Sequence, residues 1–366
     1  MRVAVLYNAV SQQDTIEDLD VLVQVDVVSQ SLKRLGHEHF AVACTLDLDA
    51  MKENLRKLRP DMVFNLVESL QGDDSLVYLP PAVLISLNLP HTGASAESLF
   101  LTTHKLLAKD RLSRAGLPTP SWIVQDAVTG GKEKSCIISP HPNPLPTNLR
   151  SVPGEGTHIS LISKEEGTLT RWIIKGVWEQ GSRDMDDDAV FSGGAAEVHR
   201  RLRERVKHTG RPAFAEEYIE GREFNLAMLS GPGPVEVLPP AEVDFSTFPV
   251  EKPRIVGYRA KWQADSFEYN NTPHRFDFPA ADQPLLDRLA DLALECWNLF
   301  MLRGWGRVDF RVDQSGRPWI LEVNANPCLS PDAGFAAALQ RAGIEFDEAI
   351  RRIVDEAKPT GCIPWA

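Results

Sequence analysis

One segment near the carboxyl end of the 366-residue chain constrains its fold more than any other, and it runs from Gly304 to Pro327. Its two halves, residues 307–312 and 319–324, alternate apolar and polar side chains. The residues between them, Gln-Ser-Gly-Arg, are typical of a turn. The segment therefore predicts a β-hairpin.

The predicted hairpin gathers four polar side chains on one face. If Asp309 lies opposite Glu322, then Arg307 lies opposite Asn324, because every second residue of a strand faces the same way. Two carboxylates and an amide then converge beside an arginine. Such oxygen donors suit magnesium, which usually keeps waters and shares its coordination with substrate phosphates. The alternative is a solvent-exposed face with a cross-strand ion pair.

Length and charge limit the class of protein. A chain of 366 residues is too long for one ordinary core and suggests about two or three domains. The net charge of -12 argues against a general nucleic-acid surface, although local basic residues can still hold a small phosphorylated ligand. Neither the start of the chain nor its most apolar segment, residues 285–302, is typical of a signal peptide or a membrane span, so we expect no membrane partner.

The cysteines favour a reducing compartment. They are odd in number and show no close pairing, which fits neither a disulfide framework nor a zinc site: Cys44, Cys136, Cys296, Cys328 and Cys362. We therefore expect a cytoplasmic protein.

The first hundred residues predict strands and helices in alternation. We expect strands at 2–7, 38–43 and 61–67 and helices at 19–35, 48–58 and 79–87. This order implies a parallel α/β sheet. The turn after the first strand is Asn8-Ala-Val-Ser and not Gly-x-Gly-x-x-Gly, so we expect no dinucleotide site.

The rest of the chain predicts a second unit and a third, antiparallel one, since strands there follow strands. The expected elements are a helix at 103–116, strands at 121–124 and 171–175, two strands around Glu220-Gly-Arg, a strand at 235–238, a strand containing Tyr258 to Trp262, a helix at 283–302, the hairpin and a helix at 345–357.

Residues 128–168 are rich in Pro, Gly, Ser and Asn, which predicts a mobile insertion, with a proline-type partner motif as the alternative. Its His141 and His158 are interpreted as solvated and not metal-bound.

Five motifs follow one another in a telling order: Lys105 opening a helix, Lys175 ending a strand, the hinge Glu216–Glu223, the Ala-Lys-Trp element at 260–262, and the hairpin. In this combination the chain resembles the ATP-grasp ligases, and within them the D-alanine–D-alanine ligase type. The likeness is weak in the first hundred residues and strong from Gly304 onward.

That resemblance implies an α/β chain, α+β in its C-terminal part, with the three-domain ATP-grasp architecture. The implied domains are an N-terminal parallel α/β domain at 1–101, a central domain at 102–213 and a C-terminal catalytic domain at 214–366.

The resemblance also implies a site for ATP, whose phosphates need positive charge and backbone donors. The implied contacts are Lys105 and Lys175 to the α- and β-phosphates, Glu179, Gly181 and Ser182 in the loop over the triphosphate, Glu223 to the ribose, and Glu216 with the backbone of Glu217 and Ile219 to the adenine.

The implied chemistry is activation of a carboxylate to an acyl phosphate, followed by attack of an amine. Lys261 would reach the transferring phosphoryl group, Ser182 would act in the covering loop, and Arg307 would stabilise the charge that develops at the reacting centres. Two magnesium ions, with manganese as a substitute, would be held by Asp309, Glu322 and Asn324.

The substrate half of the pattern is altered. Glu17, Asp18 and Asp20 stand loosely where the family has an acidic-basic-acidic run, and Gly181 replaces a serine. The remaining candidates for substrate contact, several of which depart from the family, are Glu68 for a histidine, Trp262 for a tyrosine, Asn326, and Asp332 followed by Ala333 in place of a carboxylate-binding run. Because Asp332 would repel a carboxylate, we hypothesise a small-molecule carboxylate and a cationic amine that are not two D-alanines.

Three other interpretations stay open. The chain could be a true D-alanine–D-alanine ligase that uses different residues, a catalytically silent nucleotide-binding protein, or an α/β protein without a nucleotide site. Retention of Arg307 speaks against a silent binder, which has less need of a transition-state arginine. The resemblance favours a homodimer.

Overall fold

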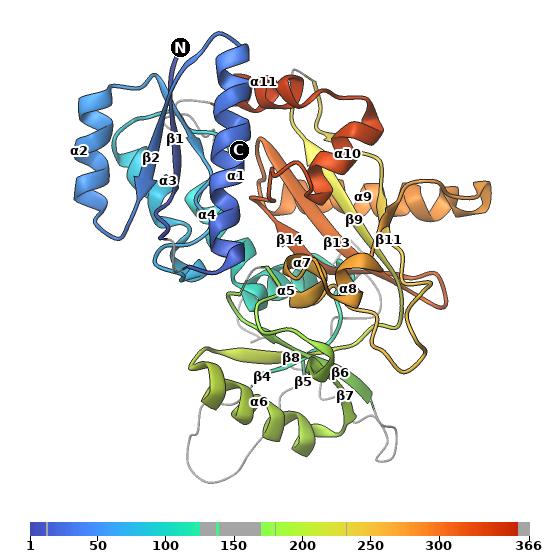
Figure 1. Ribbon diagram of the computed structural model, residues 1–366. Coiled ribbons are helices and arrows are strands. Elements are labelled where there is room, and N and C mark those ends of the chain that lie inside the picture. Colours follow the sequence, from blue (N-terminus) through green and yellow to red (C-terminus); the bar gives the residue numbers. More distant parts are fainter. Residues whose placement is uncertain (12–13, 125–136, 139–169, 180, 232, 358–366) are drawn as a thin grey trace, which may run out of the picture.

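Three sheets organise the chain in the computed structural model (Figure 1). The structure describes residues 1–11, 14–124, 137–138, 170–179, 181–231 and 233–357. The mixed α/β class expected from the sequence is confirmed. No helix within these ranges is both long and apolar enough to cross a membrane.

The N-terminal sheet is parallel, as predicted. Its central strand β1 (Arg2–Asn8) lies between β2 (Glu38–Cys44) and β3 (Met62–Asn65). Val3 and Val5 pack toward one face and Ala4 and Leu6 toward the other, which explains the unbroken apolar run of a strand buried on both sides. Helix α1 (Ile16–Arg34) covers the first face, and α2 (Leu48–Leu58) and α3 (Leu79–Ser86) cover the second.

The first turn of α1 carries two acids beside its cap. The hydroxyl of Thr15 accepts from the N–H of Asp18, and Glu17 and Asp18 face the positive end of the helix. This turn also contacts Arg183 of the candidate site.

The central sheet is antiparallel, in the order β5-β4-β8-β6-β7. Its strands are β4 (Trp122–Val124), β5 (Ile137–Ile138), β6 (Thr170–Gly176), β7 (Val190–Gly193) and β8 (Ala213–Glu217). Helix α6 (Ala195–Thr209), which the sequence analysis did not predict, covers this sheet through Val198 and Leu202. Apart from Ile137–Ile138, the expected insertion at 128–168, with His141 and His158, lies outside the described residues.

The C-terminal sheet is antiparallel, as predicted. Its order is β12-β11-β9-β13-β14, with β10 also paired to β9, and its strands are β9 (Gly221–Leu229), β10 (Glu236–Val237), β11 (Ala241–Val243), β12 (His274–Arg275), β13 (Trp305–Asp313) and β14 (Pro318–Asn324).

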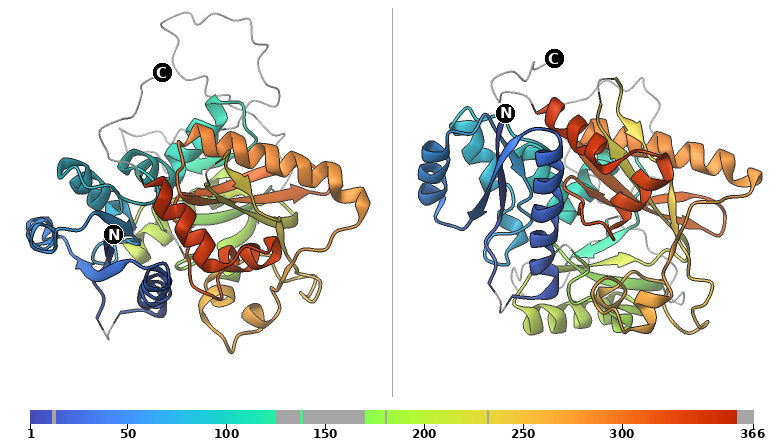
Figure 2. Two further views of the ribbon diagram at one scale, coloured as in Figure 1. Left: turned by 90° about the horizontal axis from the view of Figure 1, so that it is seen from above. Right: turned by 45° about the horizontal axis from the view of Figure 1, so that its top comes forward.

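Helices cover both faces of this third sheet (Figure 2). One face packs on the amphipathic α9 (Gln283–Leu299) together with α4 (Ala96–Thr103) and α5 (Lys105–Arg114). The other packs on α10 (Gly334–Ala342) and α11 (Phe346–Glu356), which also contact α1 of the N-terminal unit. The C-terminal helices therefore join two of the sheets into one core.

The hairpin has the predicted register. Arg307 pairs with Asn324 and Asp309 with Glu322, and both strands are antiparallel. Beyond Asp309 the register shifts by one residue, so that Phe310 lies opposite Ile320. This bulge interrupts the ladder next to the polar face, a place where bulges often re-aim side chains.

The expected strand over Tyr258 to Trp262 is wrong, because these residues form the short helix α7 (Tyr258–Trp262). Alternation over five residues cannot separate a strand from one turn of helix. The backbone of Gly257 is extended and ends the preceding segment, and α8 (Phe267–Asn270), capped by Ser266, follows closely. The helix expected at 103–116 begins at Lys105 instead, because His104 is the C-cap of α4 and the N-cap of α5, and α4 itself was not predicted.

Candidate active site

The polar face of the hairpin is tightly hydrogen-bonded. Arg307 donates from Nε and Nη2 to the two oxygens of Asp309, at 2.7 and 2.9 Å, and Asn225 of the neighbouring β9 donates to Asp309 Oδ1 at 2.8 Å. Burial alone would lower the pKa of the Arg307 guanidinium, but Asp309 and Glu322 outweigh it and raise that pKa above its usual value. Arg307 is therefore a permanent cation at this face.

Glu322 lies beside the start of α5. The Lys105 ammonium is 2.6 Å from Glu322 Oε1, and both side chains are largely buried. Burial would raise the pKa of Glu322, but the charges of Lys105, Lys261 and Arg307 hold it at about 2. The carboxylate therefore stays ionised throughout the physiological range.

The donor set of the hairpin fits a hard divalent cation. Asp309 and Glu322 are cross-strand neighbours, and Asn324, whose side-chain oxygen accepts from the N–H of Asn326 at 2.9 Å, lies one pair further along. Among the described residues no three His, Cys, Asp or Glu side chains cluster closely enough to hold a metal by themselves. Two carboxylates and an amide suit magnesium, because that ion takes its other oxygens from water and phosphate.

Lys261 joins this group from helix α7 and not from a strand. Burial and the charge of Arg307 lower the pKa of its ammonium, whereas Glu322 and Asp309 raise it in part. The changed secondary structure thus still brings Lys261 into electrostatic contact with the hairpin face.

A second cluster joins the central sheet to α5. Glu216 of β8 is buried, and its two oxygens are each 2.6 Å from an ammonium group, one of Lys175 on β6 and one of Lys109 on α5. Lys109 also donates to Thr119 and to the carbonyl of Pro120. Burial would raise the pKa of Glu216, but the two lysines lower it.

The predicted ribose ligand has an unexpected partner. Glu223 of β9 lies opposite Arg311 of β13, and Arg311 Nη2 is 2.9 Å from Glu223 Oε2. Arg311 is buried and also donates to the carbonyl of Gly221 at 3.0 Å. Burial raises the pKa of Glu223, and Arg311 only partly offsets this.

The two predicted adenine contacts that use the backbone lie at the end of β8 and just beyond it. The N–H of Glu217 donates to the carbonyl of Ser121 at 2.8 Å, which holds the end of β8 against the residue before β4. Ile219 follows in the short link to β9.

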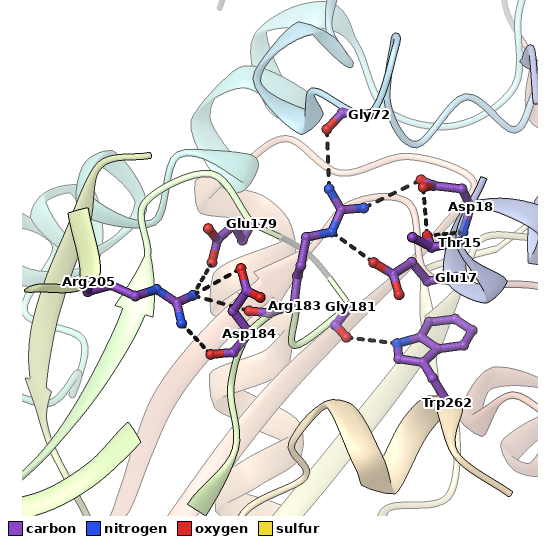
Figure 3. Close-up of polar contacts among 10 residues, drawn as sticks. All are labelled: Thr15, Glu17, Asp18, Gly72, Glu179, Gly181, Arg183, Asp184, Arg205 and Trp262. Carbon is purple, nitrogen blue, oxygen red and sulfur yellow. Dashed lines mark hydrogen bonds and ion pairs between the residues drawn. The ribbon is translucent and has the colours of Figure 1, made fainter. Parts of the chain in front are cut away.

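The predicted covering loop is held at several points, and residues 181–185 are called the covering segment (Figure 3). Trp262 donates from its indole nitrogen to the carbonyl of Gly181 at 2.9 Å, and the Ser182 hydroxyl donates to the carbonyl of Val256 at 2.8 Å. Just before the segment, Glu179 turns toward Arg205 of α6, whose Nη2 is 3.0 Å from Glu179 Oε2. The Glu179 carboxylate thus has a protein partner.

The substrate candidates form a third group, between α1 and the chain after the hairpin. Gln24 donates to Glu68 at 2.9 Å and to Asp20 at 3.3 Å, and the Cys328 thiol and the Ser330 hydroxyl both donate to Asp20 at 3.0 Å. Nearby, the Asn326 side chain donates to the carbonyl of Val67 at 3.2 Å.

Two electrostatic features mark this group. Burial, reinforced by Asp20 and other neighbouring acids, raises the pKa of Glu68 to about 7, although Gln24 lowers it in part. Burial also raises the pKa of the Cys328 thiol, which therefore donates as a neutral group. Asp332, by contrast, is exposed on the turn before α10 and makes no hydrogen bond or ion pair to the described residues.

Comparison with known proteins agrees with this geometry. Residues 194–355 match the family described as D-ala D-ala ligase C-terminus. The D-alanine–D-alanine ligase of Moorella thermoacetica is 28% identical over 98% of this chain and 99% of its own, and the uncharacterized protein y4sG of Sinorhizobium fredii is 26% identical over 91% and 86%. The crystal structure of the D-alanine–D-alanine ligase from Bacillus anthracis complexed with ATP superposes with a TM-score of 0.67, at 18% identity, over 98% of this chain and 97% of that one.

The chain is an ATP-grasp protein of the D-alanine–D-alanine ligase-like type.

In this ATP-grasp chain the sequence analysis missed several basic residues that contact predicted site residues or the covering segment, and Arg205 is one of them. Lys109 lies one helical turn after Lys105, and this i, i+4 spacing was the available signal. Arg311 continues the alternation Arg307, Asp309, Arg311 along one strand face. Arg183, in the covering segment, had no signal in the sequence, because its partners belong to the N-terminal sheet unit.

Proposed function

We propose that the protein is an ATP-dependent carboxylate–amine ligase that forms an amide bond through an acyl phosphate. The observation that carries the proposal is the hairpin face, where Arg307, Asp309 and Glu322 converge with Lys105 and Lys261. A site that transfers a phosphoryl group needs cations around the phosphates and fixed oxygen donors for a metal, and this face offers both.

The reaction has two steps. A carboxylate oxygen of the first substrate attacks the γ-phosphorus of ATP, which forms the acyl phosphate and releases ADP. The amine then attacks the acyl carbon, and inorganic phosphate leaves with the bonding electrons of the C–O bond while the nitrogen loses a proton. Activation is necessary because hydroxide is too poor a leaving group at neutral pH.

The residues divide this work by position. Lys105 and Lys175 are proposed to bind the α- and β-phosphates, and Lys261 and Arg307 to stabilise the charge that develops during transfer. Gly181 and Ser182 are proposed to cover the triphosphate. Glu216, the backbone of Glu217 and Ile219, and Glu223 are proposed to hold the adenine and ribose.

Asp309, Glu322 and Asn324 are the proposed ligands of magnesium, as two ions with manganese as a substitute. When bound, magnesium would neutralise phosphate charge and orient the triphosphate.

We further propose that the substrates are not two D-alanines and that the amine substrate carries a second cationic group besides the amine that reacts. In the described part of the chain the contacts to Asp20 and Glu68 come from neutral donors, Gln24, Cys328 and Ser330. Two acidic side chains with only neutral donors around them favour a cationic ligand and disfavour a substrate carboxylate. The exposed Asp332 contributes less to this proposal than the sequence alone indicated.

A true D-alanine–D-alanine ligase is the second candidate. The relatives of that name match nearly the whole chain, which is the observation in its favour. A nucleotide-binding protein without catalysis is the third, and the presence of Arg307 beside the two carboxylates of the hairpin face counts against it. We also propose a cytoplasmic homodimer, built from domains 1–101, 102–213 and 214–366. The three sheets agree with three domains, although β8 (Ala213–Glu217) of the central sheet extends past the second boundary.

A phosphate-release assay with MgATP tests the proposal. Amino acids, diamines and short basic peptides are offered singly and in pairs, and products are identified by mass spectrometry. We expect release only when a carboxylate and an amine with a second cationic group, such as a diamine or a basic peptide, are both present. Turnover with D-alanine as sole substrate, at about 1 per second or faster, would favour the second candidate. Tight MgATP binding without release for any pair would favour the third.

A further inference from the structure

The side chain of Arg183 ties the covering segment to the N-terminal unit (Figure 3). Its Nε donates to Glu17 Oε1 at 2.8 Å, its Nη2 is 3.4 Å from Asp18 Oδ1, and its Nη1 donates to the carbonyl of Gly72 at 3.2 Å. Glu17 and Asp18 begin helix α1, whereas Arg183 lies in the loop after β6. One guanidinium therefore joins two units that are far apart in sequence.

This contact is largely removed from water. The side chains of Arg183 and Glu17 are 17% and 9% exposed. Burial would lower the pKa of Arg183, but Asp74, Glu17 and Asp18 outweigh it and raise that pKa. Exposed ion pairs contribute little to stability, whereas loss of one partner from a buried pair leaves an uncompensated charge. Arg183 is therefore expected to matter more than a surface arginine.

The partners of Arg183 are themselves held in place. Asp18 accepts from the Thr15 hydroxyl at 2.7 Å, and Glu17 forms a hydrogen bond that raises the pKa of the Tyr258 hydroxyl to about 12. Arg183 thus meets acids whose positions are already fixed by the helix cap and by α7.

The backbone of the covering segment is held by the central unit and by the C-terminal unit. Arg205 of the central unit donates to the backbone carbonyls of Arg183 and Asp184. On the C-terminal side, the N–H of Tyr258 donates to the carbonyl of Met185 at 2.9 Å, and a Cβ at position 257 would lie 2.4 Å from the same oxygen. The segment therefore needs glycine at 257 and contacts all three units.

The backbone of the segment is strained, which explains why it needs these contacts. Gly181, Ser182 and Asp184 have φ values of 66°, 59° and 52°, and the last two are not glycine. Side chains other than glycine adopt this region only where the surroundings impose it. Without Arg183, one of the contacts that hold the strained turn in place is lost.

We propose that Arg183 is a positioning residue that fixes the covering segment against helix α1 and thereby keeps water from the acyl phosphate. This role rests on the proposed ligase function. It predicts that the segment is ordered only when the N-terminal unit is in place beside it, so that phosphate transfer and exclusion of water are coupled.

Hydrogen exchange tests the contact without any substrate. The N–H of Met185, which donates to Ser182 at 3.0 Å, and the N–H of Tyr258 report the order of the segment. In Arg183→Met we expect both to exchange at least about tenfold faster, because local opening needs less free energy. Arg200→Met is the matched control, since Arg200 is an exposed arginine of α6 paired with Glu197 and Glu204.

A stoichiometry measurement tests the consequence for the reaction. We expect about one phosphate per amide in the parent and in Arg200→Met, and at least about two in Arg183→Met, because water then competes with the amine. The KM for ATP should change less than about threefold. Arg183→Lys should restore the ratio only in part, since lysine keeps the charge but loses the forked geometry.

Hydrogen exchange tests the positioning role, and the phosphate-to-amide ratio tests the exclusion of water, so each part of the proposal can be overturned independently. Unchanged exchange of Met185 and Tyr258 in Arg183→Met overturns the positioning role, whether or not the protein proves to be a ligase. Faster exchange with an unchanged phosphate-to-amide ratio overturns the exclusion of water. If Arg183→Met does not fold, the double variant Glu17→Gln with Asp18→Asn removes the acids instead of the arginine, and the same two outcomes apply.

Discussion

The nucleotide half and the substrate half of the site handle buried charge in opposite ways. In the nucleotide half, formed by the hairpin face and the Glu216 cluster, each acid has a basic partner: Lys105 for Glu322, Arg307 for Asp309, Lys109 and Lys175 for Glu216, and Arg311 for Glu223. In the substrate half, Asp20 and Glu68 are held by neutral donors.

The pKa values express this difference. Although burial would raise both, the neighbouring cations hold the pKa of Glu322 at about 2, whereas Glu68 reaches about 7. In the nucleotide half, the buried carboxylates are therefore already paired with cations of the protein before a ligand binds. The substrate half has a negative charge that a cationic ligand would neutralise.

The largest expected effect comes from the nucleotide half. Arg307→Met should lower kcat by about 1000-fold or more, because it removes a donor aimed at charge that develops only during the reaction. Affinity for MgATP, measured by calorimetry, should change far less. Arg317→Met, at the exposed hairpin turn, is the control. An equal loss of ATP affinity and kcat would place Arg307 in binding and weaken the proposed role.

Lys109→Met should reduce the free energy of unfolding by about 3 kcal/mol, since it leaves the buried Glu216 with one lysine instead of two. Urea unfolding of the variant measures this. Lys57→Met removes an exposed lysine near Glu53 and should leave the midpoint nearly unchanged. If Lys109→Met had the same urea midpoint as Lys57→Met, the pairing of Glu216 with Lys109 would not contribute to the stability of the nucleotide half.

Ionisation of Glu68 should lower the free energy of unfolding at high pH. Below about pH 4.5 its carboxyl is protonated in the folded and unfolded states alike. Between there and its folded pKa of about 7 only the folded state keeps the proton, so stability falls as the pH rises. Above pH 7 the loss is constant, on the order of 3 kcal/mol.

Glu68→Gln should therefore be more stable than the parent at pH 8 and about equal to it at pH 4.5. Unfolding in urea at the two pH values measures the difference, with Glu53→Gln on the exposed face of α2 as control. A gain of the same size at both pH values would mean that packing, and not ionisation, separates the variants.

The smallest expected effect concerns recognition. Asp20→Asn should raise the KM for an amine with a second cationic group by about tenfold and leave the KM for ATP unchanged, because one charge contact is lost. Asp26→Asn, on the exposed face of the same helix, is the control. An amine KM equal to that of the parent would mean that Asp20 does not contact the amine substrate. This result would remove the main support for a cationic substrate.

Much of the fold could be predicted from local patterns. The apolar run of β1, the alternation of strands and helices in the first unit and the register of the hairpin were all predicted, and the structure confirms them. The strand predicted at Tyr258 to Trp262 was wrong, because five alternating residues carry too little periodicity to separate helix from strand.

The site was less accessible to such reasoning. Positions on one hairpin face follow from alternation alone, so Arg307, Asp309, Glu322 and Asn324 could be grouped from the sequence. Spacing could have placed Lys109 and Arg311 on the same helix or strand face as predicted site residues. The acids that Lys109, Arg311 and Arg183 contact could not be assigned, since each pair forms only after distant elements pack.

The sequence by itself determined which oxygens and cations share the hairpin face, because the alternation of side chains is a local property of the backbone. Only the tertiary structure decided which charges are paired. Glu17 and Arg183 are 166 residues apart, and the high pKa of Glu68 results from burial and from neighbours brought in by other elements. Burial and long-range contacts set the strength of an ionic interaction, and neither is encoded in the spacing of residues along one strand or helix.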